Sequence, residues 1–272
     1  MITVFTEIDS LPNKVRQSFD AVAQCLGASA PAPLVAAGQR LSQAIDHGEG
    51  AGLGNPYHNA QHSCEVLLCA HFLSLWTDLE VNARLEAILA ALIHDFHHDG
   101  HPNGPTPFRL ERQSVNRAMS CLIEAGLPAR QRRRIAALVL ATEIGHGLAI
   151  ARACHAYHAG NAPRLVMPVA APELAELAKS STATRQALIV CEADVLSSVG
   201  LTVEYAIRLQ DKLSFEYGVS LEKEDKLRFI SEIFPGFIIG TFFQPNVERL
   251  RQFLLLHTRD VSATSVDRHE TR

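Results

Sequence analysis

Apolar side chains recur at the spacing of an α-helix along almost the whole of this sequence, and proline or glycine separates one run from the next. In ARLEAILAALIHDF one stripe is formed by Leu85, Ile88, Leu89, Leu92 and Ile93. Similar runs occupy 60–76, 110–125, 129–141, 183–196, 203–215, 222–234 and 247–257. No run alternates apolar and polar residues convincingly, as a half-buried strand does. The sequence therefore predicts an all-α, multi-helix fold.

The same patterns predict how the chain is divided. We expect one main helical domain over residues 40–258. Residues 1–39 predict an N-terminal helical extension, in which a helix is followed by GASAPAP as a linker or a loop across the surface. Residues 158–175 are rich in Pro, Gly and Ala, without periodicity, which makes this connection a candidate lid. The polar residues 259–272 predict a flexible C-terminal tail.

Charge and cysteine usage restrict the partners and the compartment. A net charge of -4 without a basic cluster argues against nucleic acid and against an anionic membrane surface. The N-terminal MITVFTEIDSLPNK carries acids where a signal peptide needs a basic region, and no stretch approaches ~20 uninterrupted apolar residues. The six cysteines form no C-x-x-C pair, and five of them lie in apolar runs with helical spacing, which favours reduced, buried thiols over a disulfide framework: Cys25, Cys64, Cys69, Cys121, Cys154 and Cys191. We expect a cytoplasmic protein.

Two short segments, YHNAQHSCEV and LIHDFHHDGHPN, concentrate imidazole and carboxylate groups. His58 and His62 are four residues apart, so on a helix they would project from one face. His94 and Asp95 are adjacent near the end of a predicted helix. Divalent metal ions bind imidazole nitrogen together with carboxylate oxygen, and a bridging carboxylate lets two ions lie ~3.5–4 Å apart. With one further carboxylate, His62, His94 and Asp95 would form a metal site.

Asp194 is the candidate for that further carboxylate, because it is an ionisable side chain at the end of the largely apolar helical run LIVCEA. Burying a carboxylate there costs several kcal/mol unless a cation neutralises it, which a metal ion would do. A lone histidine on a helix is more often an ordinary buried or surface residue. The combination H-N-x-x-H, then H-D-x-x-H-x-G-x-x-N, then A-D is what favours metal chemistry.

These segments resemble the signature blocks of the class I 3',5'-cyclic nucleotide phosphodiesterases, the all-helical branch of the HD-domain metal-dependent phosphohydrolases. The similarity extends to ATEIGH, CEADVLSS, LQDKLSFEYG and FPGFI, and so covers most of residues 50–250. The resemblance implies a compact helical domain with a binuclear metal site that hydrolyses cAMP or cGMP to the 5'-nucleotide. It implies a small cyclic nucleotide or a related phosphoester as the partner, and it leaves a homodimer open.

For the metals, the resemblance implies that His62, His94, Asp95 and Asp194 bind a tightly held ion, usually zinc. Asp95 would also bridge to a second divalent ion, usually magnesium or manganese.

The resemblance assigns further positions around the metals. His58 matches the general acid, and Glu216 matches the carboxylate that orients it. His98 matches a histidine beside the metal-bound water. Glu111 and Thr142 match positions that hold waters of the second ion.

Substrate recognition is where the sequence departs from the family. Phe237 matches the aromatic residue that clamps the base, and we expect Tyr57, Asn103 and Phe234 to line the same site. However, Phe234 stands where the family has the glutamine that hydrogen-bonds the purine. Ser197 stands where it has an asparagine, and Gln244 could substitute for one of these amides.

The hydrolytic residues are therefore present, while the base preference stays open. Three alternatives also stay open. The chain could hydrolyse another small phosphoester. It could be an iron-dependent oxygenase, because His and Asp ligands also suit iron. It could also be a catalytically degenerate nucleotide-sensing module.

Overall fold

The computed structural model describes residues 1–48, 54–234, 236–237 and 242–263, and these residues form helices and loops without a strand. The all-α prediction is confirmed. In chain order the helices are α1 (Ile2–Asp9), α2 (Lys14–Leu26), α3 (Ala32–Asp46), α4 (Ala60–Ser74), α5 (Val81–Ile93), α6 (Arg109–Glu124), α7 (Ala129–Leu140), α8 (Gly147–His158), the 3-10 turn η1 (Pro172–Leu174), α9 (Ala175–Lys179), α10 (Ser181–Val199), α11 (Val203–Tyr217), α12 (Lys223–Ile233) and α14 (Gln244–Ala263).

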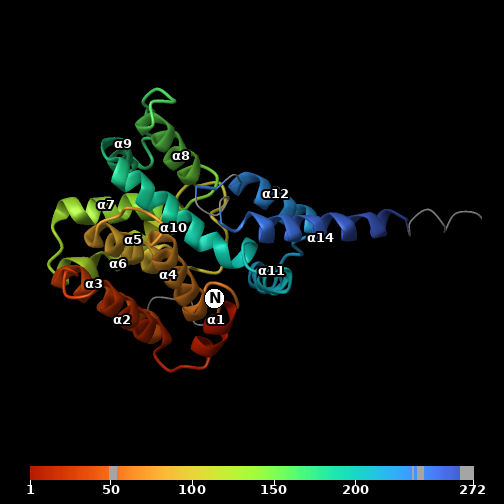
Figure 1. The fold of residues 1–272 in the computed structure, drawn as a ribbon, viewed down its shortest axis with the longest axis horizontal. Helices are drawn as coiled ribbons and strands as arrows, with labels where there is room; N and C mark the ends of the chain where they lie inside the picture. Colours follow the sequence, from red (N-terminus) through yellow and green to blue (C-terminus); the bar gives the residue numbers. More distant parts are fainter. Residues whose placement is uncertain (49–53, 235, 238–241, 264–272) are drawn as a thin grey trace, which may run out of the picture.

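Helices α4, α5 and α10 form the centre of the core (Figure 1). Helix α10 packs along both α4 and α5, and its side chains are buried on almost every face. In α5, Ala87, Ala90 and Ala91 have no exposed surface, and such small side chains let neighbouring helices approach closely. His94 and Asp95 directly follow α5, and Asp194 belongs to α10, so the candidate ligands stand on the most buried helices.

The N-terminal helices belong to the same hydrophobic core as the rest of the chain. Helix α2 packs against α3 and α4, and Phe5 of α1 and Phe19 of α2 are fully buried in that core. Gly38 of α3 accommodates Phe19: a Cβ at position 38 would lie 2.0 Å from Cζ of Phe19, so a larger residue would displace the ring. The expected boundary between residues 39 and 40 falls inside α3. Helices α2 and α3 pack together, and this packing buries the apolar face of each helix.

Helices α3, α8 and the short α9 were not predicted from the sequence. Helix α3 begins at Ala32 and has Pro33 in its first turn, where a fixed φ and a missing N–H are tolerated, so the stretch GASAPAP leads into a helix instead of a linker. Helix α8 precedes the 158–175 connection. That connection ends in η1, where Leu174 is buried in the core. The role of this segment as a lid stays a prediction.

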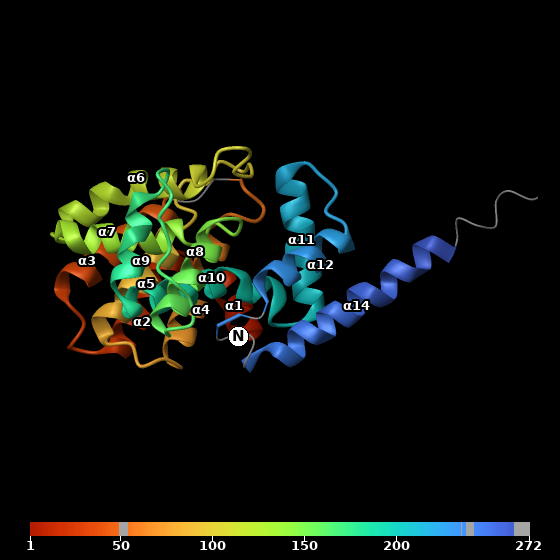
Figure 2. The ribbon, with the colours of Figure 1, turned by 90° about the horizontal axis from the view of Figure 1, so that it is seen from above.

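Helices α11, α12 and α14 lie to one side of the other helices (Figure 2). Helix α14 packs against α11 and α12 and then extends away from them. Residues 259–263 of the predicted tail continue α14, and 264–272 lie outside the described residues. No single described helix has the length and apolarity to cross a membrane; only α10 and α11 taken together, with a 101° bend between them, meet those criteria.

Candidate metal centre

The first part of the site surrounds the start of α4. The side chain of Asn59 accepts hydrogen bonds from the backbone N–H groups of Gln61 (2.9 Å) and His62 (3.3 Å), which caps α4 so that it begins at Ala60. His62 therefore lies in the first turn of α4, whereas His58 precedes the helix, contrary to the expectation that both share one helical face. Their ring centroids are nevertheless 5.7 Å apart, so both side chains reach the same site.

The structure brings the four predicted ligands together, and we call His62, His94, Asp95 and Asp194 the ligand cluster. Their ligand atoms all lie within 4.8 Å of one another. Nε2 of His62 is 3.3 Å from Oδ2 of Asp95 and 3.3 Å from Oδ1 of Asp194. Nε2 of His94 is 3.0 Å and 3.4 Å from the same two oxygens. Donor atoms bound at 2.0–2.2 Å to one tetrahedral ion lie about 3.3–3.6 Å apart, so the cluster fits a divalent metal ion.

A backbone contact fixes the ring of His94. Nδ1 of His94 donates a hydrogen bond to the carbonyl oxygen of Ala91 at 2.7 Å. This contact places a proton on Nδ1, so Nε2 is the nitrogen that faces the two carboxylates and that a metal ion would bind.

Charge compensation dominates the electrostatics of the ligand cluster. Burial alone would raise the pKa of Asp95, but the neighbouring His94 and His58 hold that pKa well below its usual value. Burial alone would lower the pKa of His62, but hydrogen bonds to Asp194 and Asp95 raise it to about 9. Without a metal, the carboxylates therefore hold protons on the histidines, and a bound cation would replace those protons.

His58 and Glu216 form a second functional group, although 158 residues separate them in the chain. Nδ1 of His58 forms a short hydrogen bond with Oε1 of Glu216, which stands near the end of α11. Oε2 of Glu216 accepts the backbone N–H groups of Tyr57 (2.8 Å) and His58 (2.9 Å). Burial acts to raise the pKa of Glu216, but the hydrogen bond with His58 lowers it. The side chain is therefore an anion beside the imidazole.

His98 stacks on the ring of His58 with 3.6 Å between centroids. His58, Asp95 and His98 also make a group whose ligand atoms lie within 4.8 Å of one another. Nδ1 of His98 accepts the backbone N–H of Gly100 at 3.0 Å, which leaves Nε2 as an N–H donor. Burial lowers the pKa of His98 to about 4. A neutral histidine with a donating Nε2 suits a contact to water or substrate better than a bond to a metal.

Glu111 and Thr142 lie in the wall of the cavity beside the ligand cluster. Asn103 donates through Nδ2 to both carboxylate oxygens of Glu111, at 3.2 and 3.1 Å, and its Oδ1 accepts the backbone N–H of Leu110 at 2.8 Å. Burial raises the pKa of Glu111 to about 7. The hydroxyl of Thr142 donates to the carbonyl oxygen of Val139, which leaves its lone pairs available.

A cavity of about 300 Å³ opens over the ligand cluster. Of the predicted residues, its wall includes Tyr57, His58, His94, Asp95, His98, Asn103, Glu111, Thr142 and Asp194. His62 and Glu216 lie behind this wall, in contact with residues that form it. The remaining predicted residues, Phe234 and Phe237, are not among the described residues that line this cavity.

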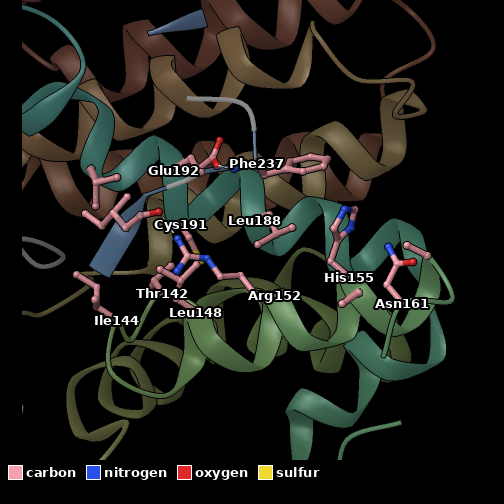
Figure 3. A pocket seen from close by; sticks show the side chains of 15 residues that line it. Thr142, Ile144, Leu148, Arg152, His155, Asn161, Leu188, Cys191, Glu192 and Phe237 are labelled. Carbon is pink, nitrogen blue, oxygen red and sulfur yellow. Dashed lines mark hydrogen bonds between the residues drawn. The ribbon is translucent and has the colours of Figure 1, made fainter. Parts of the chain in front are cut away.

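Phe237 lines a neighbouring cavity of about 340 Å³, where its ring meets His155 at 4.9 Å between centroids (Figure 3). The two cavities share Thr142 in their walls. The backbone N–H of Phe237 donates to the carboxylate of Glu192 on α10. Phe234 is partly buried against the core. Phe237 thus packs against α8 and α10, and the role of these two phenylalanines in substrate binding stays a prediction.

Phe229 of α12 lines the cavity over the ligand cluster, and the sequence reasoning missed it. It also missed Lys226, which is only 8% exposed. A signal was present in the sequence: Lys226 lies four and seven residues before Ile230 and Ile233, so it occupies the apolar stripe of α12. A lysine at a core-facing position is unusual.

Replacing Lys226 with methionine is expected to stabilise the protein by about 2–3 kcal/mol at pH 7. Burial lowers the pKa of Lys226 from 10.5 to about 8. The folded protein therefore releases this proton at lower pH than the unfolded chain does. The free energy of unfolding of the wild type consequently increases as the pH rises from about 8 to about 10.5. Urea unfolding at pH 7 and pH 10 measures both effects, and the methionine variant should lack this pH-dependent gain.

The matched control is Lys179→Met, which changes an exposed lysine on α9 and should alter the free energy of unfolding by less than about 0.5 kcal/mol. Equal stability of Lys226→Met and wild type at pH 7 would show that the ammonium of Lys226 is well solvated.

The comparisons with known proteins agree with this geometry. No family model matches the chain. A segment of 67 residues is 39% identical to the probable 3',5'-cyclic phosphodiesterase pde-1 of Caenorhabditis elegans, and the match covers 22% of this chain and 9% of that relative. The matched segment is therefore a small part of the relative's length.

Solved structures match over almost the whole chain. The phosphodiesterase domain of the RhoPDE fusion protein from the choanoflagellate Salpingoeca rosetta has a TM-score of 0.66 at 17% identity, and the match covers 94% of each chain. The phosphodiesterase domain of Salpingoeca rosetta rhodopsin phosphodiesterase has a TM-score of 0.65 at 16% identity, over 94% of this chain and 91% of that one. The fold implied by the sequence resemblance is confirmed: this chain has the fold of a phosphodiesterase domain.

Proposed function

We propose that the protein hydrolyses a 3',5'-cyclic nucleotide to the 5'-nucleotide. One observation carries the proposal: the His58–Glu216 pair stands at the edge of the ligand cluster, with Nε2 of His58 3.8 Å from Oδ2 of Asp95. A proton donor and a divalent-metal site thus face one cavity. The phosphodiesterase-domain fold and the partial similarity to a probable 3',5'-cyclic phosphodiesterase support the same chemistry.

The residues suggest how the metals are held. The ligand cluster would hold a tightly bound ion, for which zinc suits the two imidazoles and two carboxylates. Asp95 would be shared with a second ion, magnesium or manganese, and Glu111 and Thr142 would hydrogen-bond its waters. When bound, such ions neutralise the anionic phosphodiester and activate a water for attack on phosphorus.

His58 supplies the other requirement of the reaction. The ribose oxygen is a poor leaving group unless it gains a proton as the P–O bond breaks, and Nε2 of a cationic His58 can donate that proton. Glu216 accepts from Nδ1, which stabilises the cation and fixes the ring. The backbone N–H groups of Tyr57 and His58 donate to Oε2 of Glu216 and hold that carboxylate in place. Neutral His98 stacks on the ring and adds no competing positive charge.

The test is to incubate purified protein with Mn²⁺ or Mg²⁺ and to follow 3',5'-cAMP and 3',5'-cGMP by chromatography. We expect 5'-nucleotide to form, and we expect a chelator to stop the reaction. Absence of turnover while both metals are bound would contradict the proposal. Oxygen consumption with bound iron would then identify an oxygenase. Nucleotide binding without turnover would identify a sensing module, and hydrolysis of a different ester would identify another phosphohydrolase.

A further inference from the structure

The loop between α5 and α6 carries backbone strain at both ends. Its residues His97 and Phe108 have positive φ angles, 62° and 61°, in the left-handed region that is unfavourable for a residue with a side chain. The loop joins Asp95 of the ligand cluster to Glu111 in the first turn of α6. Such a conformation persists only where the surrounding contacts enforce it, so specific side chains must hold this loop in place.

The first part of the loop is held from two sides. The side-chain amide of Asn55 donates a hydrogen bond to the carbonyl oxygen of His98 at 3.1 Å. The side-chain amide of Gln113 on α6 donates to the carbonyl oxygen of His97 at 2.9 Å. Neither contact involves residues 99–103, so the histidines that follow Asp95 are anchored independently of the second part of the loop.

Arg109, the first residue of α6, holds the second part of the loop. Its guanidinium donates to both carboxylate oxygens of Asp99, at 2.5 and 3.4 Å. It also donates to three backbone carbonyl oxygens, those of His101 (3.4 Å), Pro102 (3.0 Å) and Asn103 (3.4 Å). An isolated ion pair on a side chain that is 32% exposed contributes little, but here one rigid planar group bridges four residues of the loop. The position of residues 99–103 therefore depends on Arg109.

Asn103 transmits this position to Glu111. Helix α6 has no side-chain cap from its N-cap residue, which is Phe108. Instead, Oδ1 of Asn103 accepts the backbone N–H of Leu110 at 2.8 Å and takes the place of a cap. Nδ2 of Asn103 donates to both carboxylate oxygens of Glu111, at 3.2 and 3.1 Å. The orientation of the Glu111 carboxylate thus depends on Asn103, whose own backbone is held by Arg109.

We propose, on the basis of the proposed function, that Arg109 is a positioning residue for the second divalent ion. Glu111 lines the cavity beside the ligand cluster, where it would hold waters of that ion, whereas Arg109 is not among the described residues of the cavity wall. Without Arg109, the second part of the loop loses its anchor and Asn103 no longer fixes Glu111. The tightly held ion should stay in place, because the ligand cluster makes none of these contacts.

Arg109→Gln should weaken binding of the second ion about tenfold and leave the tightly held ion unchanged. Zn²⁺-loaded protein is titrated with Mn²⁺, and free Mn²⁺ is followed by electron paramagnetic resonance, so the measurement needs no substrate. The Mn²⁺ concentration that gives half-maximal turnover should rise by the same factor. Zn²⁺ content after dialysis reports the tightly held ion and shows that the variant is folded.

Two variants serve as controls. Arg109→Lys keeps a positive charge beside Asp99 but lacks the planar fork, so it should restore the Mn²⁺ affinity only in part. Arg40→Gln removes an exposed arginine that pairs with Glu124 at 2.8 Å, and it should keep the wild-type affinity. Equal Mn²⁺ affinity of Arg109→Gln and wild type, or a wild type that binds no Mn²⁺ beside Zn²⁺, would overturn the proposal. So would loss of Zn²⁺ from Arg109→Gln, because Arg109 would then support the whole site.

The binding titration separates this inference from the proposed function. If no cyclic nucleotide is hydrolysed but Arg109→Gln still weakens Mn²⁺ binding, the positioning role stands and the hydrolytic function fails. If hydrolysis occurs and Mn²⁺ binds equally well to Arg109→Gln and wild type, the function stands and the role of Arg109 fails.

Discussion

Asp194→Asn is expected to lose its tightly bound divalent ion and, with it, all measurable hydrolysis. Oδ1 of Asp194 lies 3.3 Å from Nε2 of His62 and 3.4 Å from Nε2 of His94, which is the spacing of ligands on one ion. An amide oxygen is neutral and a weaker ligand, so we expect metal affinity to fall by about 100-fold or more. Metal content per chain after dialysis measures this loss, and wild type should retain about one equivalent.

The same variant has a readout that does not depend on activity. Metal binding to the folded state raises its stability, so added Zn²⁺ should raise the Tm of the metal-depleted wild type and leave that of Asp194→Asn almost unchanged. Asp211→Asn, an exposed aspartate on α11, is the control and should behave as wild type. A fully loaded Asp194→Asn protein would exclude Asp194 as a ligand.

His58→Ala is expected to keep the metal and to lower kcat by about 10²–10⁴-fold. Nδ1 of His58 is held by Glu216, and its Nε2 is 3.8 Å from Asp95, which suits a proton donor at the edge of the ligand cluster. Metal content and kcat are measured on the same preparation. His71→Gln changes a histidine of α4 outside the cluster and serves as the control. Loss of metal in His58→Ala would show that His58 is itself a metal ligand. Its ligand atom lies within 4.8 Å of those of Asp95 and His98, so such a role is sterically feasible.

Glu216→Gln tests how Glu216 supports His58. The amide keeps the size of the side chain but removes the negative charge beside Nδ1 of His58, so kcat should fall by about ten- to hundredfold while the metal content stays unchanged. Both quantities are measured on one preparation with both metals saturating, and a kcat equal to that of wild type would count against this role of Glu216.

The ligand cluster could be predicted from the sequence because its signals are local. His94 and Asp95 are neighbours at the end of a strongly periodic helix, and Asp194 interrupts an apolar run, which marks a buried charge that needs compensation. The residues that bind the substrate were harder to predict from the sequence. Similarity of short blocks pointed to Phe234 and Phe237, whereas the structure brings Phe229 to the cavity over the ligand cluster. The exact register of α12 against α11 decides which side chains face the cavity.

The sequence by itself determined the helical architecture and the chemistry of the metal site, since a period of 3.6 residues and the donor types are properties of short segments. Tertiary structure alone decided two things. It packed residues 1–39 into the common core, because the apolar faces of α2 and α3 cover each other and α4. It also buried Lys226 and Gln210 in one cavity, because packing between distant helices depends on the shapes of whole surfaces, which no short segment encodes.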